Sequence, residues 1–137
     1  MRNICLLFLL ITSLVTTSCN KEDMGAVCGI ASNDGKYELR SQTGGIIGKT
    51  VIYPAGNGNA YLFESSTYKL YTDGQLSKSG TYKVIQDSSF VLHQPASRIV
   101  FDSGNDMIRT LIQFSTKRMR IQEDVYDGRT YEYEKIE

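Results

Sequence analysis

The stretch TYKLYTDGQLSKSGTY, residues 67–82, decides the fold class of this chain. Before its turn, Tyr68 and Leu70 lie two residues apart and therefore share one face of an extended strand, whereas Lys69 lies on the other face. The pair Asp73-Gly74 follows at once, and an Asp-Gly pair between alternating segments is a strong short-range signal for a β-hairpin. The stretch therefore predicts two antiparallel strands joined by a tight turn.

The same pattern continues outward in both directions. Tyr, Val, Ile, Thr and Phe dominate the segments between turn residues, which favours strands. Asp34-Gly35 and Asp127-Gly128 are further hairpin signals, while Ser79-Gly80 and Ser103-Gly104-Asn105 indicate bends. No apolar stripe at helical spacing continues for three turns. We expect strands at residues 36–42, 50–53, 60–64, 67–72, 80–86, 90–94, 98–102, 107–115, 118–125 and 130–136.

These segments predict an all-β fold in which short antiparallel strands must avoid open edges. Closure into an up-and-down barrel of about eight strands removes every edge, and a two-sheet sandwich is the alternative. Alternation places Tyr37, Tyr68 and Tyr82 inside such a barrel, together with Met119 and Ile121. Buried tyrosine hydroxyls need hydrogen-bond partners. These three tyrosines are therefore the candidate ligand-binding residues if the barrel is open.

The beginning of the chain predicts export from the cytoplasm. Arg2 supplies a positive charge, residues 4–15 are mostly apolar, and the small residues at positions 16–18 lead directly into Cys19. The apolar stretch is shorter than the roughly 20 residues that a transmembrane helix needs. We therefore predict a lipoprotein signal peptide at residues 1–18. Cys19 would carry a thioether-linked diacylglycerol and an N-acyl chain such as palmitate, and these chains would anchor the protein in the outer membrane.

The residues after Cys19 refine this prediction. Lys21, Glu22 and Asp23 resemble the export signal that follows the lipidated cysteine in Bacteroidetes lipoproteins sent to the cell surface. This resemblance implies surface exposure, whereas a solvated tether would explain the same residues. We expect residues 19–33 to form a lipidated flexible tether and residues 34–137 to form the barrel domain.

Charge and cysteine content exclude several classes of function. After removal of residues 1–18, acidic residues exceed basic ones by one, so no basic stripe favours nucleic acid. Cys5 leaves with the signal peptide and Cys19 is acylated, which leaves Cys28 without an intrachain disulfide partner. We expect Cys28 to be a small buried or tether residue. No cysteine–histidine cluster suits zinc, so we expect no metal site and no cofactor.

Three motifs resemble functional sites and fail on inspection. Residues 43–50, TGGIIGKT, imitate a phosphate-binding loop but lack its first glycine and are followed by an extended segment instead of a helix. Residues 102–106, DSGND, begin like a calcium loop, but Gly104 stands at the third position, which needs an oxygen ligand, and Gln113 stands at the twelfth, which needs Glu. His93 is the sole histidine, and no serine elbow accompanies it. Glu132 and Glu134 face Arg118 and Arg120 across the last hairpin, which predicts an exterior ion-pair ladder and no catalytic residues.

Several short motifs, taken in order, resemble a known family. They are GKYEL at residues 35–39, TGGIIG at 43–48, TYKLYTDG at 67–74, SGTY at 79–82 and YDGRTYEY at 126–133. Their order and spacing are similar to those of the small lipocalin-like lipoproteins of Bacteroidetes. The resemblance implies an eight-stranded barrel. That family usually has Trp near the start of its first strand, where this chain has Tyr37, and the smaller ring predicts a smaller plug at the barrel floor.

Two functions remain after these exclusions. The first is a membrane-anchored lipoprotein that binds a small apolar or amphipathic ligand inside the barrel, as the resemblance implies. The second is a non-catalytic structural or protein-interaction module whose barrel is filled. Inward aromatic side chains that meet in the middle would favour the second function. The loop at residues 53–60 would line the barrel mouth in the first case and be a connector in the second.

Overall fold

The computed structural model describes residues 33–46, 48–102, 104 and 107–137. The predicted signal peptide, tether and surface-export signal lie outside the described residues, as do Cys19 and Cys28. The strands are β1 (Gly35–Gly44), β2 (Thr50–Ile52), β3 (Ala60–Glu64), β4 (Thr67–Thr72), β5 (Gln75–Ser88), β6 (Pro95–Phe101), β7 (Thr110–Phe114), β8 (Arg118–Glu123) and β9 (Arg129–Lys135). The described part of the chain contains no helix.

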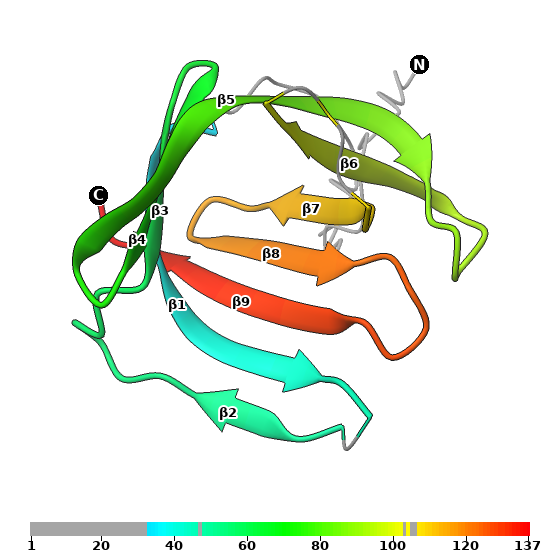
Figure 1. Cartoon of the computed structure of the whole chain (residues 1–137), viewed down its shortest axis with the longest axis horizontal. Coiled ribbons are helices and arrows are strands. Elements are labelled where there is room, and N and C mark those ends of the chain that lie inside the picture. The colour runs from blue at the N-terminus through cyan, green and yellow to red at the C-terminus, as the bar shows by residue number, and fades with distance from the viewer. Residues whose placement is uncertain (1–32, 47, 103, 105–106) are drawn as a thin grey trace, which may run out of the picture. The chain divides into compact units, whose positions relative to one another are not determined.

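The strands close into an antiparallel barrel (Figure 1). β3 to β9 pair in sequence order, and β1 pairs with β3 through its first residues and with β9 along its length. β2 lies outside this ring and pairs with the last part of β1. Because β1 hydrogen-bonds to neighbours on both edges, the eight-stranded barrel has no open edge there, which confirms the predicted barrel. The sandwich alternative is wrong.

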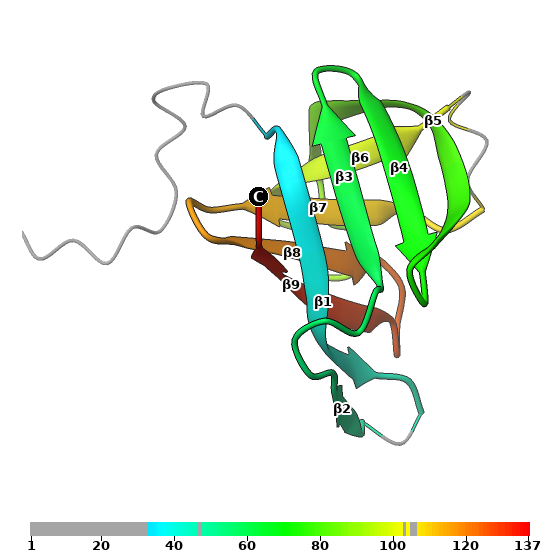
Figure 2. The ribbon, with the colours of Figure 1, turned by 90° about the vertical axis from the view of Figure 1, so that its left-hand side faces the viewer.

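The predicted alternation sets which side chains fill the barrel. Tyr37, Tyr68 and Tyr82 are buried, as are Met119 and Ile121 on β8. Arg118 and Arg120, their neighbours along β8, are exposed. Figure 2 shows β1, β3 and β4 side by side, with the C-terminal end beside the first half of β1. The two-residue period that predicted the strands therefore also identified their inner faces.

The predicted strand at residues 90–94 is wrong. Ser89 to Gln94 instead form the turn between β5 and β6. The backbone N–H groups of Phe90 and Val91 donate to the Asp124 carboxylate, at 2.6 and 3.3 Å, and Leu92 N–H donates to Ser89 Oγ at 2.9 Å. His93 has a positive φ of 53°. Side chains thus take the hydrogen bonds that a neighbouring strand would have provided.

The expected bend at Ser79-Gly80 is also wrong, because β5 passes through both residues. The first half of β5 pairs with β4 as far as Thr81, and the second half pairs with β6 from Tyr82 onward. A Cβ atom at position 80 would overlap the Asp102 carboxylate. Glycine at the point where β5 changes partners therefore leaves room for the side chain of Asp102, which follows β6.

Candidate functional site

The barrel interior is the first place to look for a ligand site, and aromatic rings fill it. Phe63, at 0% exposure, packs against the rings of Tyr37, Tyr82 and Phe114 with centroid separations of 6.1, 4.7 and 5.7 Å. Tyr37 also contacts Phe114 edge-on at 5.7 Å. The smaller plug expected at Tyr37 is therefore one ring of a packed aromatic group.

A second aromatic group adjoins the first through the neighbouring residue on the same face of β3. Tyr61 stacks on Phe63 at 5.5 Å and on Phe101 at 6.0 Å, and it meets Tyr133 edge-on at 5.6 Å. The ring centroids of Tyr68 and Phe101 lie 4.6 Å apart. The seven strands β1, β3, β4, β5, β6, β7 and β9 all contribute rings, and β8 adds Met119 and Ile121 to the same core.

The three predicted ligand residues thus all lie in one buried core cluster, but they belong to its two adjoining aromatic groups. Tyr37 and Tyr82 both contact Phe63. Tyr68 belongs to the second group, and its hydroxyl donates to Asp102 Oδ2 at 3.2 Å. Tyr61 was not among the predicted site residues, although it lies two residues before Phe63 and therefore shares a strand face with it. Burial raises the pKa of Tyr61 to about 12, and burial also raises the pKa of Tyr133.

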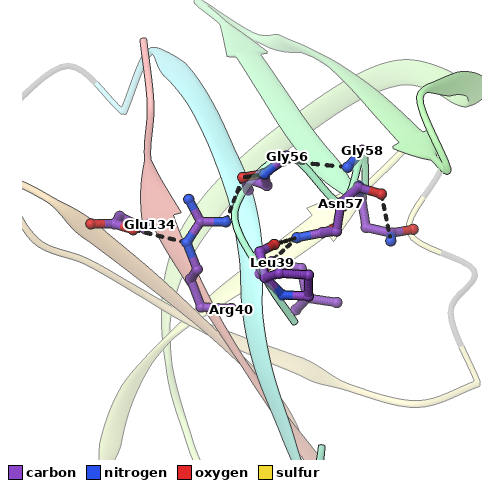
Figure 3. A network of polar contacts seen from close by, with 9 residues as sticks. Leu39, Arg40, Gly56, Asn57, Gly58 and Glu134 are labelled. Atoms are coloured by element: carbon purple, nitrogen blue, oxygen red, sulfur yellow. Dashed lines mark hydrogen bonds and ion pairs between the residues drawn. The ribbon is translucent and has the colours of Figure 1, made fainter. Parts of the chain in front are cut away.

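A polar network outside the barrel holds the loop between β2 and β3 (Figure 3). Glu38 lies on the outer face of β1, yet it is only 5% exposed. Its carboxylate accepts hydrogen bonds from Gly56 N–H at 3.0 Å, from Gly58 N–H at 3.3 Å and from the Arg40 guanidinium. Arg40 in turn donates to Glu134 Oε2 on β9 at 2.8 Å. The network therefore joins the loop, β1 and β9.

The same loop replaces a strand partner where β1 has an irregularity. The register between β1 and β9 shifts at Arg40. There, Tyr53 N–H donates to the Arg40 carbonyl, and Leu39 N–H donates to the Asn59 carbonyl, both at 2.8 Å. Asn57 Nδ2 donates to the Leu39 carbonyl, also at 2.8 Å. This loop is therefore an ordered connector that satisfies the backbone of β1.

Replacement of Glu38 by glutamine should destabilise the protein by about 2 kcal/mol, because the new amide would present N–H groups to donors that now share a carboxylate. Burial alone would raise the pKa of Glu38. The hydrogen bonds from Gly56 N–H, Arg40 and Gly58 N–H outweigh burial, so the pKa of Glu38 is lowered. A lowered pKa stabilises the folded state above the unfolded-state pKa, about 4.3, and the stabilisation is lost as the pH falls further. Urea unfolding at several pH values measures the difference.

The control for this change is Glu64→Gln, since Glu64 on β3 is exposed and pairs with Lys69 on the surface. We expect Glu64→Gln to change stability by less than about 0.5 kcal/mol. The difference in free energy of unfolding between the wild type and Glu38→Gln should become smaller below about pH 4, where the wild-type carboxylate is itself protonated. An equal effect of the two substitutions at pH 7 would contradict the structural role of Glu38.

A second buried carboxylate organises one end of the barrel. The side chain of Asp124, immediately after β8, has no exposed surface. It accepts the Ser89 hydroxyl at 2.6 Å in addition to the two backbone N–H groups of the β5–β6 turn. Arg109 Nε lies 3.8 Å away, and Arg109 Nη2 donates to the Ser88 carbonyl at 2.6 Å. The ends of β5 and β8 and the start of β7 are therefore held together.

The outer face of β7 to β9 carries a shallow depression of about 280 Å³, lined by Gln113, Ser115, Arg118, Arg120 and Glu132. Arg120 Nε lies 2.7 Å from Glu132 Oε1, as the ladder prediction required. Glu134 pairs with Arg40 on β1 instead of Arg118. The predicted ladder is therefore correct for one pair and wrong for the other, because β9 has a second neighbour in a closed barrel.

The motifs that failed in sequence also have structural explanations. Thr50 begins strand β2. The Asp102 carboxylate accepts Thr81 N–H at 3.0 Å and lies 3.3 Å from Lys78 Nζ. His93 is exposed, and it contacts the turn through its backbone N–H, which donates to the Ser89 carbonyl at 3.0 Å. Among the described residues, no group of acidic, histidine or cysteine side chains is arranged to hold a metal ion.

No protein-family model, curated protein or solved structure matches this chain. In the part of the chain that the structure describes, no helix is long and apolar enough to cross a membrane.

Proposed function

We propose that this protein is a lipid-anchored envelope protein whose filled barrel is a non-catalytic interaction or structural module. The observation that carries the proposal is the aromatic packing around Phe63 and Tyr61. A carrier for a small apolar ligand needs an interior left open by small or polar side chains. The inward positions of this barrel instead hold large rings in mutual contact, so its contacts with other molecules are expected on its outer surface and loops.

Anchoring through acylated Cys19 is the second part of the proposal, and the sequence of residues 1–23 supports it. The small residues before Cys19 suit cleavage at that position. Several acyl chains, each contributing about 0.8 kcal/mol per buried methylene, would hold the protein stably without a membrane-spanning segment. Residues 21–23 further suggest that the barrel is presented at the cell surface.

Mass spectrometry tests both parts. The full chain is expressed in a bacterial host that exports lipoproteins, and its denatured mass is measured. We expect a chain that begins at Cys19 and carries diacylglyceryl and N-acyl groups, and we expect no acyl mass for the Cys19→Ser variant. An unmodified wild-type amino terminus would contradict the anchor.

The unacylated Cys19→Ser protein, expressed without residues 1–18, tests the barrel separately. It is exposed to a bacterial lipid extract, desalted and measured by native mass spectrometry. We expect the mass of the protein alone. A reproducible one-to-one adduct would favour the carrier function and overturn the filled-barrel proposal.

A further inference from the structure

Large apolar side chains project into solvent from four loops. Ile46 between β1 and β2 is 95% exposed, and Met107 between β6 and β7 is 101% exposed. Phe90 and Leu92 in the β5–β6 turn are 59% and 57% exposed, and Tyr126 between β8 and β9 is 73% exposed. Single exposed apolar residues are ordinary, but a group of them on one part of a surface indicates an interaction site.

The four loops lie at the same end of the barrel. Gly44 at the end of β1 pairs with Arg129 at the start of β9, which brings the β1–β2 and β8–β9 loops together. Asp124 binds the β5–β6 turn, and its backbone N–H donates to the carbonyl of Arg109, two residues after Met107. In Figure 1 the tips of the β1–β2, β5–β6 and β8–β9 loops lie on the right. We call this end, with Ile46, Phe90, Leu92, Met107 and Tyr126, the apolar loop end.

The opposite end of the barrel has a different character. There the chain enters β1 and leaves β9, and charged groups pair across the two segments. Lys36 Nζ lies 3.8 Å from Glu137 Oε1, and Lys135 Nζ donates to the Asp34 carbonyl at 2.7 Å. Paired charges therefore join the first and last segments of the barrel at this end, whereas the five apolar loop tips project from the other end.

We propose that the apolar loop end docks onto a lipid bilayer, with its five apolar side chains inserted among the head groups and upper acyl chains. Insertion requires that backbone N–H groups be satisfied within the protein, because hydrocarbon offers no hydrogen-bond acceptors. Asp124 and Ser89 accept the N–H groups of Phe90, Val91, Leu92 and His93. These four backbone N–H groups can therefore enter an apolar environment with their hydrogen bonds satisfied.

The charges at this end indicate how such docking would respond to salt. The exposed Lys49 and Arg129 are matched by Asp127 and the half-buried Glu123. Asp87 lies 3.0 Å from Arg98 Nε and 2.9 Å from Arg109 Nη2. Since positive and negative groups balance, the apolar side chains drive binding. Zwitterionic lipid should suffice, with little dependence on ionic strength.

The length of the preceding segment allows this orientation, a step that rests on the proposed lipid anchor. Residues 19–33 span at most about 50 Å when extended. The ten residues of β1 span about 33 Å between the entry point and the apolar loop end. The segment can therefore reach past the barrel, so that either end can face the membrane that holds Cys19. Tethering raises the local concentration of bilayer and makes weak insertion effective.

Vesicle binding tests the proposal with the unacylated chain, residues 19–137 carrying Cys19→Ser, so that failure of the lipid anchor cannot affect the result. The protein is sedimented with phosphatidylcholine vesicles. We expect binding that the double substitution Phe90→Ser and Leu92→Ser weakens by about tenfold or more. The control is Leu76→Ser at the start of β5, because Leu76 is 57% exposed, like Leu92, but lies near the β4–β5 hairpin. It should change binding by less than about twofold.

Fluorescence gives a second measurement that does not depend on the fold of a polar variant. The chain contains no tryptophan, so Phe90→Trp introduces a single fluorophore. We expect its emission to shift to shorter wavelength with vesicles and to be quenched by brominated lipid, whereas Leu76→Trp shows neither change. Wild-type protein that stays in the supernatant would overturn the proposal. An equal loss of vesicle binding in Leu76→Ser and in the double variant would also overturn it. So would a wild-type protein that binds no vesicles but self-associates through a contact that the double substitution abolishes.

Discussion

Replacement of Asp124 by alanine is expected to lower the free energy of unfolding by about 3–5 kcal/mol. The substitution removes the acceptor for the Ser89 hydroxyl and for two backbone N–H groups, and it leaves Arg109 with one carboxylate fewer. Asp124→Asn should also destabilise, by about 2 kcal/mol, because its amide offers N–H groups where only acceptors fit. Urea denaturation at pH 7 measures both differences.

The effect should depend on pH. Burial alone would raise the pKa of Asp124. Hydrogen bonds from Phe90 N–H, the Ser89 hydroxyl and Val91 N–H outweigh burial, so the pKa of Asp124 is lowered. The carboxylate therefore stabilises the fold above the unfolded-state pKa, about 4, and this stabilisation is lost as the pH falls below that value. The difference in free energy of unfolding between the wild type and Asp124→Ala should therefore be smaller at about pH 3 than at pH 7.

The control is Glu132→Ala, which removes a surface carboxylate paired with Arg120. It should cost at most about 1 kcal/mol. If Asp124→Ala cost no more than Glu132→Ala at pH 7, Asp124 would not organise the loops as described.

Phe63→Ala is expected to destabilise the protein by about 3–5 kcal/mol, which is the usual range for deletion of a buried phenylalanine ring. Phe63 is fully buried, and its loss removes packing from Tyr37, Tyr61, Tyr82 and Phe114 together. Thermal and urea unfolding give the measurement. For a chain of this size, a loss of this magnitude should lower Tm by well over 10 °C.

Phe90→Ala is the matched control, since the same ring is removed from a position that is 59% exposed. It should change the free energy of unfolding by less than about 0.5 kcal/mol. Similar effects at positions 63 and 90 would mean that the interior of the barrel is loosely packed.

The strands were predictable because their signals are local. The Asp73-Gly74 turn and the alternation of Tyr68, Lys69 and Leu70 involve neighbouring residues, and the structure confirms both hairpin and inner face. Barrel closure was predictable in kind, since an antiparallel sheet of short strands must protect its edges. The prediction of a strand at residues 90–94 was wrong because the carboxylate of Asp124, more than 30 residues away in the sequence, accepts the hydrogen bonds of Phe90 N–H and Val91 N–H.

The buried carboxylates show why the remaining features could not be predicted. Alternation places Glu38 on the outer face of β1, where exposure is expected, and the loop that covers it is separated from it by all of β2. Asp124 has the sequence context of an ordinary turn residue. The roles of both depend on which distant segments meet in the folded chain. The aromatic core was predictable in part. The spacing of Tyr61 and Phe63 in the sequence indicates that they share a face of β3, but the rings that they contact come from other strands.

The central claim, that the barrel is filled, is tested most directly by uptake of an apolar probe. Benzene is titrated into the wild type and into Phe63→Ala below the unfolding temperature of both, and binding is followed by NMR. We expect no saturable uptake by the wild type and one-to-one uptake by Phe63→Ala, because an apolar cavity of ring size binds benzene. Saturable one-to-one binding inside the wild-type barrel would contradict the claim and restore the carrier function.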